Sequence, residues 1–183
     1  MPPRQIVKFA FFADSHIGFD SVSRPRIERR RRDADFFANY ISILKYAKNR
    51  GLDFIVHGGD LFYRSKISTN LVMKAFEPLF DLADCEIPVY LVPGNHERGA
   101  IPYRLIAEHP GINIFDFPQT FVFHKGKSHI ALGGFPYTKN IRENFINTIR
   151  QTGLFETKAN YKILCMHQIV EGTTVGPKNF TFR

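Results

Sequence analysis

The sequence predicts an α/β fold, a layered structure in which a parallel or mixed sheet is flanked by helices. Apolar segments of strand length at 6–13, 53–57 and 88–92 alternate with two longer segments whose apolar residues recur at helical spacing. Strands that alternate with helices form parallel sheets, because each crossover helix returns the chain to the same end of the sheet. Shorter strand-like segments in the second half of the chain predict a mixed or layered arrangement.

Each long helix has its own boundary signal. The helix over 33–50 has Gly51 where a helix ends. The next is capped at Ser68-Thr69-Asn70, and Pro78 inside it predicts a kink or a division. The remaining expected elements are a short helix at 103–108, strands at 112–115, 120–124 and 128–133 with a hairpin turn at 125–127, a helix at 141–150 and a strand at 161–166.

Length and composition indicate one globular domain over 1–183. The chain has 183 residues and 44% of them are hydrophobic, which is enough for one core. The formal net charge of +8 favours an anionic partner such as nucleic acid or a phosphate ester, although a basic surface that only confers solubility explains it equally well. The first apolar stretch is short and contains Lys8, so no membrane segment is expected and a cytoplasmic location is the simplest interpretation.

Polar residues that can bind a metal ion follow four of the expected strands. They are Asp14, His16, Asp60, Asn95, His96 and His167. The carboxyl ends of parallel strands share one edge of a sheet, so these side chains converge if the strands are neighbours. Carboxylate, imidazole and amide ligands suit Mn²⁺, Fe²⁺ or Zn²⁺ better than Ca²⁺. Two such ions about 3.5–4 Å apart can clamp a phosphate ester and activate water for in-line attack.

The segments ADSH, GGDLF and PGNHE, followed by the strand that ends in His167, resemble the successive motifs of calcineurin-like metallophosphoesterases. The longer stretches HGGDLF and IPVYLVPGNHE are similar to the DNA-repair exonucleases of the SbcD type. The resemblance extends from Ile6 to about Gln168. It implies a metal-dependent phosphodiesterase that acts on DNA, a Mn²⁺-dependent exonuclease or endonuclease.

The same resemblance implies a role for each site residue. Asp14 and His16 would bind the first ion, Asn95 and His167 the second, and Asp60 would bridge them. Mn²⁺ is the expected metal, with Fe²⁺, Zn²⁺ and Mg²⁺ as alternatives.

Two further residues of the PGNHE segment receive roles in catalysis. His96 would contact the scissile phosphate and assist the leaving oxygen, and Glu97 would orient His96 through a hydrogen bond. By family analogy the partners are DNA, a second copy of the chain and a coiled-coil ABC-type ATPase.

One family motif is missing. The family supplies two more histidines in a G-H-x-H motif after the strand that ends in His167, and this chain has none before Arg183. We expect a domain truncated on its C-terminal side, the first part of a longer nuclease; the alternative is a degenerate site. In either case both ions would lack a ligand and bind weakly.

An arginine-rich run follows the first metal motif. It contains Arg24, Arg26, Arg29, Arg30, Arg31 and Arg32. Arginine suits bidentate phosphate contacts, so the run is expected to bind the DNA backbone, although a solvated helix start remains the alternative. Tyr63 and Arg64, which follow GGDLF, are expected to add substrate contacts.

Two other functions remain open on the sequence. One is a phosphomonoesterase or a small-molecule phosphodiesterase with the same metal site. The other is a non-catalytic DNA-binding module, which the missing histidines favour if the chain ends at Arg183. His57, within an apolar strand, is expected to be a buried histidine with satisfied hydrogen bonds, and a supporting role behind the metal ligands is the alternative. Gly58, Gly59 and Gly94 are expected to permit close backbone approach and positive φ angles near the site.

Overall fold

The computed structural model describes residues 5–19, 33–97 and 109–169. Four strands form the first sheet in the order β1-β2-β3-β4, and every pair is parallel. Their bounds are β1 Phe9–Phe12, β2 Phe54–His57, β3 Val89–Leu91 and β4 Ile112–Ile114. The strands are shorter than the apolar segments that predicted them, but their order along the chain is as expected.

A second sheet is built from the later segments. It contains β5 Gln119–Lys125, β6 Ser128–Gly134 and β7 Tyr161–Cys165. The pair β5 and β6 is antiparallel around the expected hairpin turn, whereas β7 pairs with β6 in parallel. The strands from Gln119 onward therefore form a separate mixed sheet.

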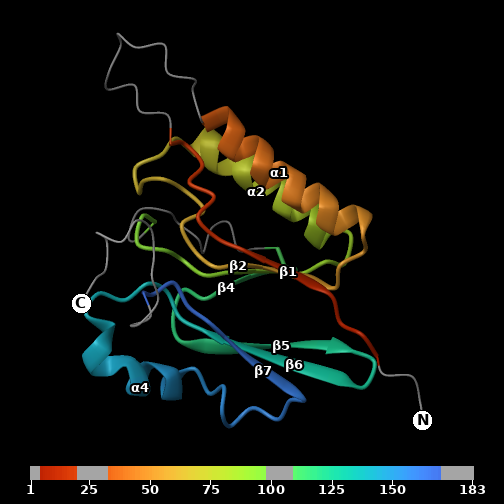
Figure 1. The fold of residues 1–183 in the computed structure, drawn as a ribbon, viewed down its shortest axis with the longest axis vertical. Helices are drawn as coiled ribbons and strands as arrows, with labels where there is room; N and C mark the ends of the chain where they lie inside the picture. Colours follow the sequence, from red (N-terminus) through yellow and green to blue (C-terminus); the bar gives the residue numbers. More distant parts are fainter. Residues whose placement is uncertain (1–4, 20–32, 98–108, 170–183) are drawn as a thin grey trace, which may run out of the picture.

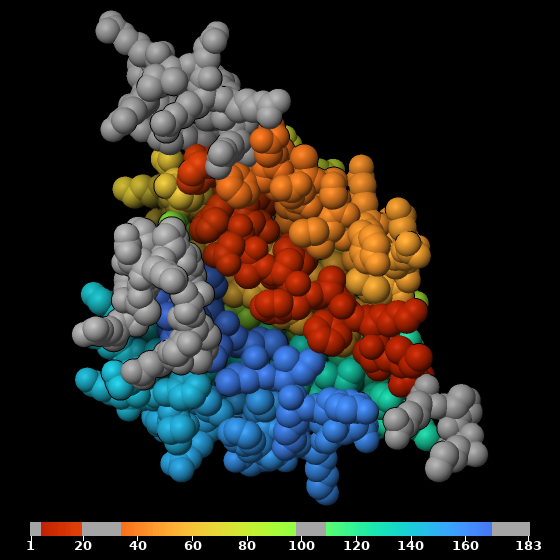
Figure 2. Space-filling view, viewed as in Figure 1, coloured from red at the N-terminus to blue at the C-terminus, as the bar shows by residue number. Residues whose placement is uncertain are grey.

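The molecule is layered, as the sequence predicts. Helices α1 Asp33–Asn49 and α2 Thr69–Ala83 lie together on one face of the first sheet, and the second sheet covers the opposite face (Figure 1). Helix α4 Ile141–Gln151 lies on the outer side of the second sheet (Figure 1). In the same view, residues of the first strand (red) and of the last strand (blue) both reach the surface on one face of the molecule (Figure 2).

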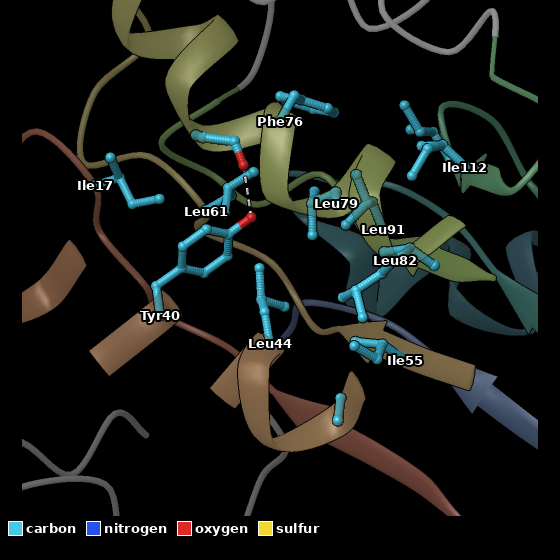
Figure 3. Packing of buried hydrophobic residues seen from close by; sticks show 14 of the residues in the cluster. Ile17, Tyr40, Leu44, Ile55, Leu61, Phe76, Leu79, Leu82, Leu91 and Ile112 are labelled. Carbon is cyan, nitrogen blue, oxygen red and sulfur yellow. Dashed lines mark hydrogen bonds between the residues drawn. The ribbon is translucent and has the colours of Figure 1, made fainter. Parts of the chain in front are cut away.

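Two hydrophobic cores join the layers. Between the helices and the first sheet, Leu44, Phe76 and Leu82 pack against Ile55 and its neighbours (Figure 3). The hydroxyl of Tyr40 on α1 donates to the carbonyl of Ala75 on α2 at 2.7 Å, which satisfies a fully buried polar group (Figure 3).

The second core lies between the two sheets. Phe54 and Val56 of β2 point toward Ile130 and Leu132 of β6, and all four side chains are buried. Alternate residues of β2 therefore face opposite cores, which explains why this strand reads as a continuous apolar run.

Helix α2 differs from its prediction in one respect. The side chain of Ser68 caps it, accepting a hydrogen bond from the N–H of Leu71, but the helix runs through Pro78 as one element. The buried face around Phe76, Leu79 and Leu82 packs on the sheet on both sides of the proline, so packing keeps the two halves together. Of the two outcomes predicted for Pro78, a kink or a division, the division is wrong because α2 is a single element. The expected helix at 103–108 lies outside the described residues.

Candidate metal centre

The loops that follow β1 and β2 lie side by side at one edge of the first sheet. The N–H of Asp14 donates to the carbonyl of Gly59 at 2.9 Å, and the N–H of His16 donates to the carbonyl of Asp60 at 3.0 Å. A parallel bridge between Ile17 and Phe62 continues the pairing. Backbone hydrogen bonds therefore hold two of the expected metal motifs next to each other.

Three candidate ligands have left-handed backbone conformations. The φ angles are +57° at Asp14, +42° at His16 and +53° at Asp60. Residues other than glycine rarely adopt this region, and such strain gathers where the structure needs a side chain in one particular direction. Here it turns the three side chains toward a common point.

Asp60 is the centre of the cluster. Its carboxylate is almost fully buried, and Oδ2 lies 3.5 Å from Nε2 of His167 and 3.7 Å from Nε2 of His96. Burial pushes the pKa of Asp60 upward, but hydrogen bonds from the His167 side chain and the His96 backbone outweigh it and hold this pKa below its usual value. Asp60 is therefore ionised, as a bridging ligand must be.

His167 brings the second sheet to the same point. Its Nδ1 donates to the carbonyl of Gly58 at 2.9 Å, and its Nε2 lies 3.1 Å from Oδ1 of Asn95. Since Nδ1 carries the proton toward a carbonyl, Nε2 is the atom that can bind a metal ion. The hydrogen bond with Asp60, against the opposing effect of burial, raises the pKa of His167 to about 8 in the metal-free chain.

His16 supports a metal site through its unsatisfied ring. Its Nδ1 is buried and has no hydrogen-bond partner among the described residues, while Nε2 lies 3.5 Å from Oδ1 of Asp14. Burial lowers the pKa of His16, and the negative charges of Asp60 and Asp14, which raise this pKa, only partly offset the effect. A neutral imidazole with an unused buried nitrogen is suited to metal binding, because an orphaned polar atom is otherwise costly.

Five side chains form two overlapping groups of candidate ligands. One group is His16, Asp60 and His96, and the other is Asp14, Asp60 and His167. In each group the ligand atoms lie within 4.8 Å of one another. Asp60 belongs to both, which fits a bridging carboxylate between two ions.

Glu97 holds backbone groups of two neighbouring loops. It is 1% exposed, and its two oxygens accept hydrogen bonds from the N–H groups of Phe62 and Gly94, at 2.8 Å and 2.7 Å. The ring of His96 contacts the carbonyl of Tyr63 through Nδ1. The buried carboxylate thus anchors the turn after β3 to the loop after β2, and the backbone of Tyr63 orients His96. That Glu97 also orients His96 through a direct hydrogen bond stays a prediction.

Aromatic side chains border His96 and His16. The Tyr63 ring stacks on His96 with centroids 5.5 Å apart, and the Arg64 guanidinium carbon lies 5.6 Å from the centroid of the same ring. The rings of His16 and His96 are 5.1 Å apart. Tyr63 and Arg64 therefore lie beside the cluster, and their contact with the substrate stays a prediction. The six arginines between Arg24 and Arg32 lie outside the described residues.

Two glycines are required by close approach, as expected. A Cβ on Gly94 would collide with the carboxylate and the backbone nitrogen of Asp60, and one on Gly59 would collide with the ring of His167. Gly59 also has a φ of +117°. Larger residues at these positions would push candidate ligands apart.

His57 is a buried histidine with both ring nitrogens satisfied, which confirms the prediction. It is 1% exposed, and its ring bonds the Ser15 hydroxyl and the N–H of Gly59. The contribution of Ser15 was not predicted. Its position between Asp14 and His16 is the only sequence signal that pointed to it.

Residues 7–179 match the calcineurin-like phosphoesterase family. The chain belongs to this family. The cluster at the sheet edges is therefore the candidate metal centre of a calcineurin-like phosphoesterase, and the resemblance seen in the sequence motifs is confirmed.

Among curated relatives, this phosphoesterase is similar to proteins named DNA double-strand break repair protein Mre11. It is 27% identical to the one from Saccharolobus solfataricus over 91% of this chain and 42% of the relative, and 25% identical to the one from Methanococcus maripaludis over 90% and 44%. This phosphoesterase thus spans less than half the length of these relatives. Among solved structures, a dimetal phosphatase from Danio rerio aligns at a TM-score of 0.45 and 15% identity, over 79% of this chain and 50% of that chain.

Among the described residues of this phosphoesterase, no helix is long and apolar enough to cross a membrane.

Proposed function

We propose that this chain carries the phosphodiester-cleaving centre of a metal-dependent DNA-repair nuclease. The observation that carries the proposal is the position of Asp60. Its carboxylate is buried and belongs to two groups of candidate ligands that come from the ends of different strands. The family and the names of the relatives support phosphoester chemistry on DNA. The high positive charge of the chain supports an anionic polymer as substrate.

The residues present supply part of the ligand set for two divalent ions, since the two histidines of the G-H-x-H motif are absent from this sequence. Asp14 and His16 would hold one ion, Asn95 and His167 the other, and Asp60 both. When bound, the ions would activate water and stabilise the negative charge that develops on the phosphate. By family analogy Mn²⁺ would be the working ion; the oxygen and nitrogen donors suit Mn²⁺, Fe²⁺ or Zn²⁺, and Mg²⁺ is a further alternative.

His96 would act on the leaving group. Its Nδ1 donates to the Tyr63 carbonyl, which fixes the ring so that Nε2 faces the cluster near Asp60. A proton on Nε2 would then be positioned for the departing oxygen of the DNA backbone. Tyr63 and Arg64 at the border would contact the substrate, and the arginines from Arg24 to Arg32 would bind neighbouring phosphates.

The partners follow from the same proposal. DNA would be the substrate, and a second copy of the chain and a coiled-coil ABC-type ATPase are proposed as partners of the complete protein by family analogy. The cell compartment would be the cytoplasm.

The first experiment compares the 183-residue chain with its His96→Ala variant on end-labelled linear DNA in Mn²⁺. We expect cleavage by the parent chain and a loss of about 10²–10⁴-fold in rate in the variant, the range typical of acid–base groups. Mn²⁺ affinity, measured in parallel, should change little, because the proposed ligands remain. A large loss of Mn²⁺ affinity would instead make His96 a ligand, as its grouping with His16 and Asp60 allows.

Two further substrates separate the competing functions. Rapid hydrolysis of an aryl phosphate monoester with slow cleavage of DNA would favour a phosphomonoesterase. Salt-sensitive DNA binding without turnover, unchanged in His96→Ala, would favour a non-catalytic DNA-binding module.

A further inference from the structure

The two ligand loops need a support that holds their side chains in place. Asp14, His16 and Asp60 all have positive φ angles, and the backbone hydrogen bonds between their loops fix the main chain but not the directions of the side chains. A strained conformation persists only where the surrounding structure holds it. The residues that could supply this support are Ser15, which stands between two candidate ligands, and His57, which ends β2.

His57 connects both loops through its two ring nitrogens. Nδ1 lies 3.3 Å from the N–H of Gly59, and Nε2 lies 2.9 Å from Oγ of Ser15. A backbone N–H can only donate, so Nδ1 accepts and the proton must be on Nε2, which donates to Ser15. One neutral tautomer therefore satisfies both contacts.

The pair is shielded from solvent. His57 is 1% exposed, Ser15 is 8% exposed, and the ring of Phe12 packs edge-on against His57 with centroids 4.9 Å apart. Burial lowers the pKa of His57 to about 3, so the neutral ring persists at physiological pH. A buried hydrogen bond of this kind is costly to break and defines the geometry of the groups that it joins.

We propose that Ser15 and His57 form a latch that sets the spacing between the Asp14–His16 loop and the Gly59–Asp60 loop, and so sets the affinity of the metal centre. The inference rests on the proposed function, because Asp14, His16 and Asp60 must be metal ligands for the latch to matter. Ser15 and His57 are positioning residues and touch no substrate. They act as outer partners that hold ligands, whose loss typically lowers metal affinity about 10–100-fold.

The test is a double-mutant cycle read out by Mn²⁺ binding. Ser15→Ala removes the hydroxyl, whereas His57→Asn retains an acceptor for the Gly59 N–H but has no group that reaches Ser15. Each variant should weaken Mn²⁺ binding about 10-fold or more. The double variant should be hardly worse than the His57→Asn variant, since the same hydrogen bond is lost in both.

His109→Asn is the matched control. His109 also accepts a hydrogen bond through Nδ1 from the glycine two residues later, at 3.1 Å, and its Nε2 contacts Asp84. These contacts lie beside the end of α2, away from the candidate ligands, so Mn²⁺ affinity should stay at the parent value. If His109→Asn lowered Mn²⁺ affinity as much as His57→Asn does, the proposed latch would be overturned.

The side chain of His57 also has a spectroscopic signature. In ¹⁵N NMR of the metal-free chain, His57 should be a neutral Nε2–H tautomer, with slow exchange of that proton, and Ser15→Ala should speed the exchange. The Nδ1–H tautomer would overturn the latch whether or not the variants fold. Mn²⁺ affinities equal to the parent would overturn it too. The titration must reach the high Mn²⁺ concentrations that a centre lacking two family ligands requires, and a parent chain that binds no Mn²⁺ there would overturn the proposed function and with it the role of the latch.

Discussion

The carboxylate of Asp60 lies 3.5 Å from Nε2 of His167, which joins the end of a strand in the first sheet to the end of a strand in the second. Residues from both sheets therefore contribute to the candidate metal centre. His167 follows β7, which pairs only with β6 among the described strands. Its place in the site therefore depends on how the two sheets pack.

Asp60→Asn should abolish Mn²⁺ binding. The amide keeps the shape of the side chain but removes the charge that both groups of candidate ligands share. We expect the affinity for Mn²⁺ to fall by more than about 100-fold. Loss of a residue that only hydrogen-bonds to a metal ligand typically lowers metal affinity by up to about 100-fold, and loss of a ligand should cost more. Titration calorimetry would measure it. Asp84→Asn, at an exposed carboxylate that binds His109, is the control and should leave affinity unchanged.

Glu97→Gln should destabilise the fold. Both oxygens of the buried carboxylate accept backbone N–H groups, and an amide would place a donor against one of them. The free energy of unfolding should fall by about 1–3 kcal/mol, the usual range for an unsatisfied buried partner. Urea denaturation tests this. Glu77→Gln on the exposed face of α2 should change it by less than about 0.5 kcal/mol, and equal effects would refute the anchoring role of Glu97.

Gly94→Ala should disrupt the metal centre by crowding. The added methyl group would collide with the carboxylate of Asp60 and displace it. Mn²⁺ affinity should therefore fall about 10-fold or more, as it does when a residue that orients a metal ligand is lost. Gly51→Ala is the comparison, because its φ is +56° but no atom lies within 4 Å of the added Cβ. That change should cost about 1 kcal/mol of stability through backbone strain and leave Mn²⁺ affinity as it was.

His57 should make stability depend on pH on the acid side. Its pKa is lowered from 6.5 to about 3 by burial, so between these values the unfolded chain binds a proton that the folded chain does not. Stability is therefore lost as the pH falls below about 6.5, with a slope near 1.4 kcal/mol per pH unit from this group. Urea denaturation at several pH values should show a shallower slope for His57→Asn than for the parent. Identical slopes would show that His57 is not buried in its neutral form.

The arginine run should govern the salt dependence of DNA binding. If Arg29, Arg30, Arg31 and Arg32 contact phosphates, their replacement by glutamine should reduce the slope of log K against log salt by roughly one unit per lost contact. Fluorescence anisotropy at several salt concentrations would measure it. Replacement of Lys45 and Lys48 on α1 by glutamine is a charge control, and an equal change in slope per removed charge would assign the effect to net charge alone.

Local patterns in the sequence predicted most of the elements and most of the site. Helical spacing and strand-length apolar runs depend on neighbouring residues, so α1, α2 and the parallel strands could be predicted. The motif order predicted which residues gather at the strand ends. The uninterrupted course of α2 through Pro78 could not be predicted, because packing on the sheet outweighs a local helix breaker.

The sequence by itself determined the chemistry of this protein: which side chains can bind metal ions, and that they follow strands. Only the tertiary structure decided which atoms meet. The loops after β1 and β2 are hydrogen-bonded to each other, and Ser15 is hydrogen-bonded to His57. Glu97 accepts hydrogen bonds from the backbone of Phe62 and Gly94. These contacts join segments that are far apart in the chain, and their geometry depends on the packing of both sheets.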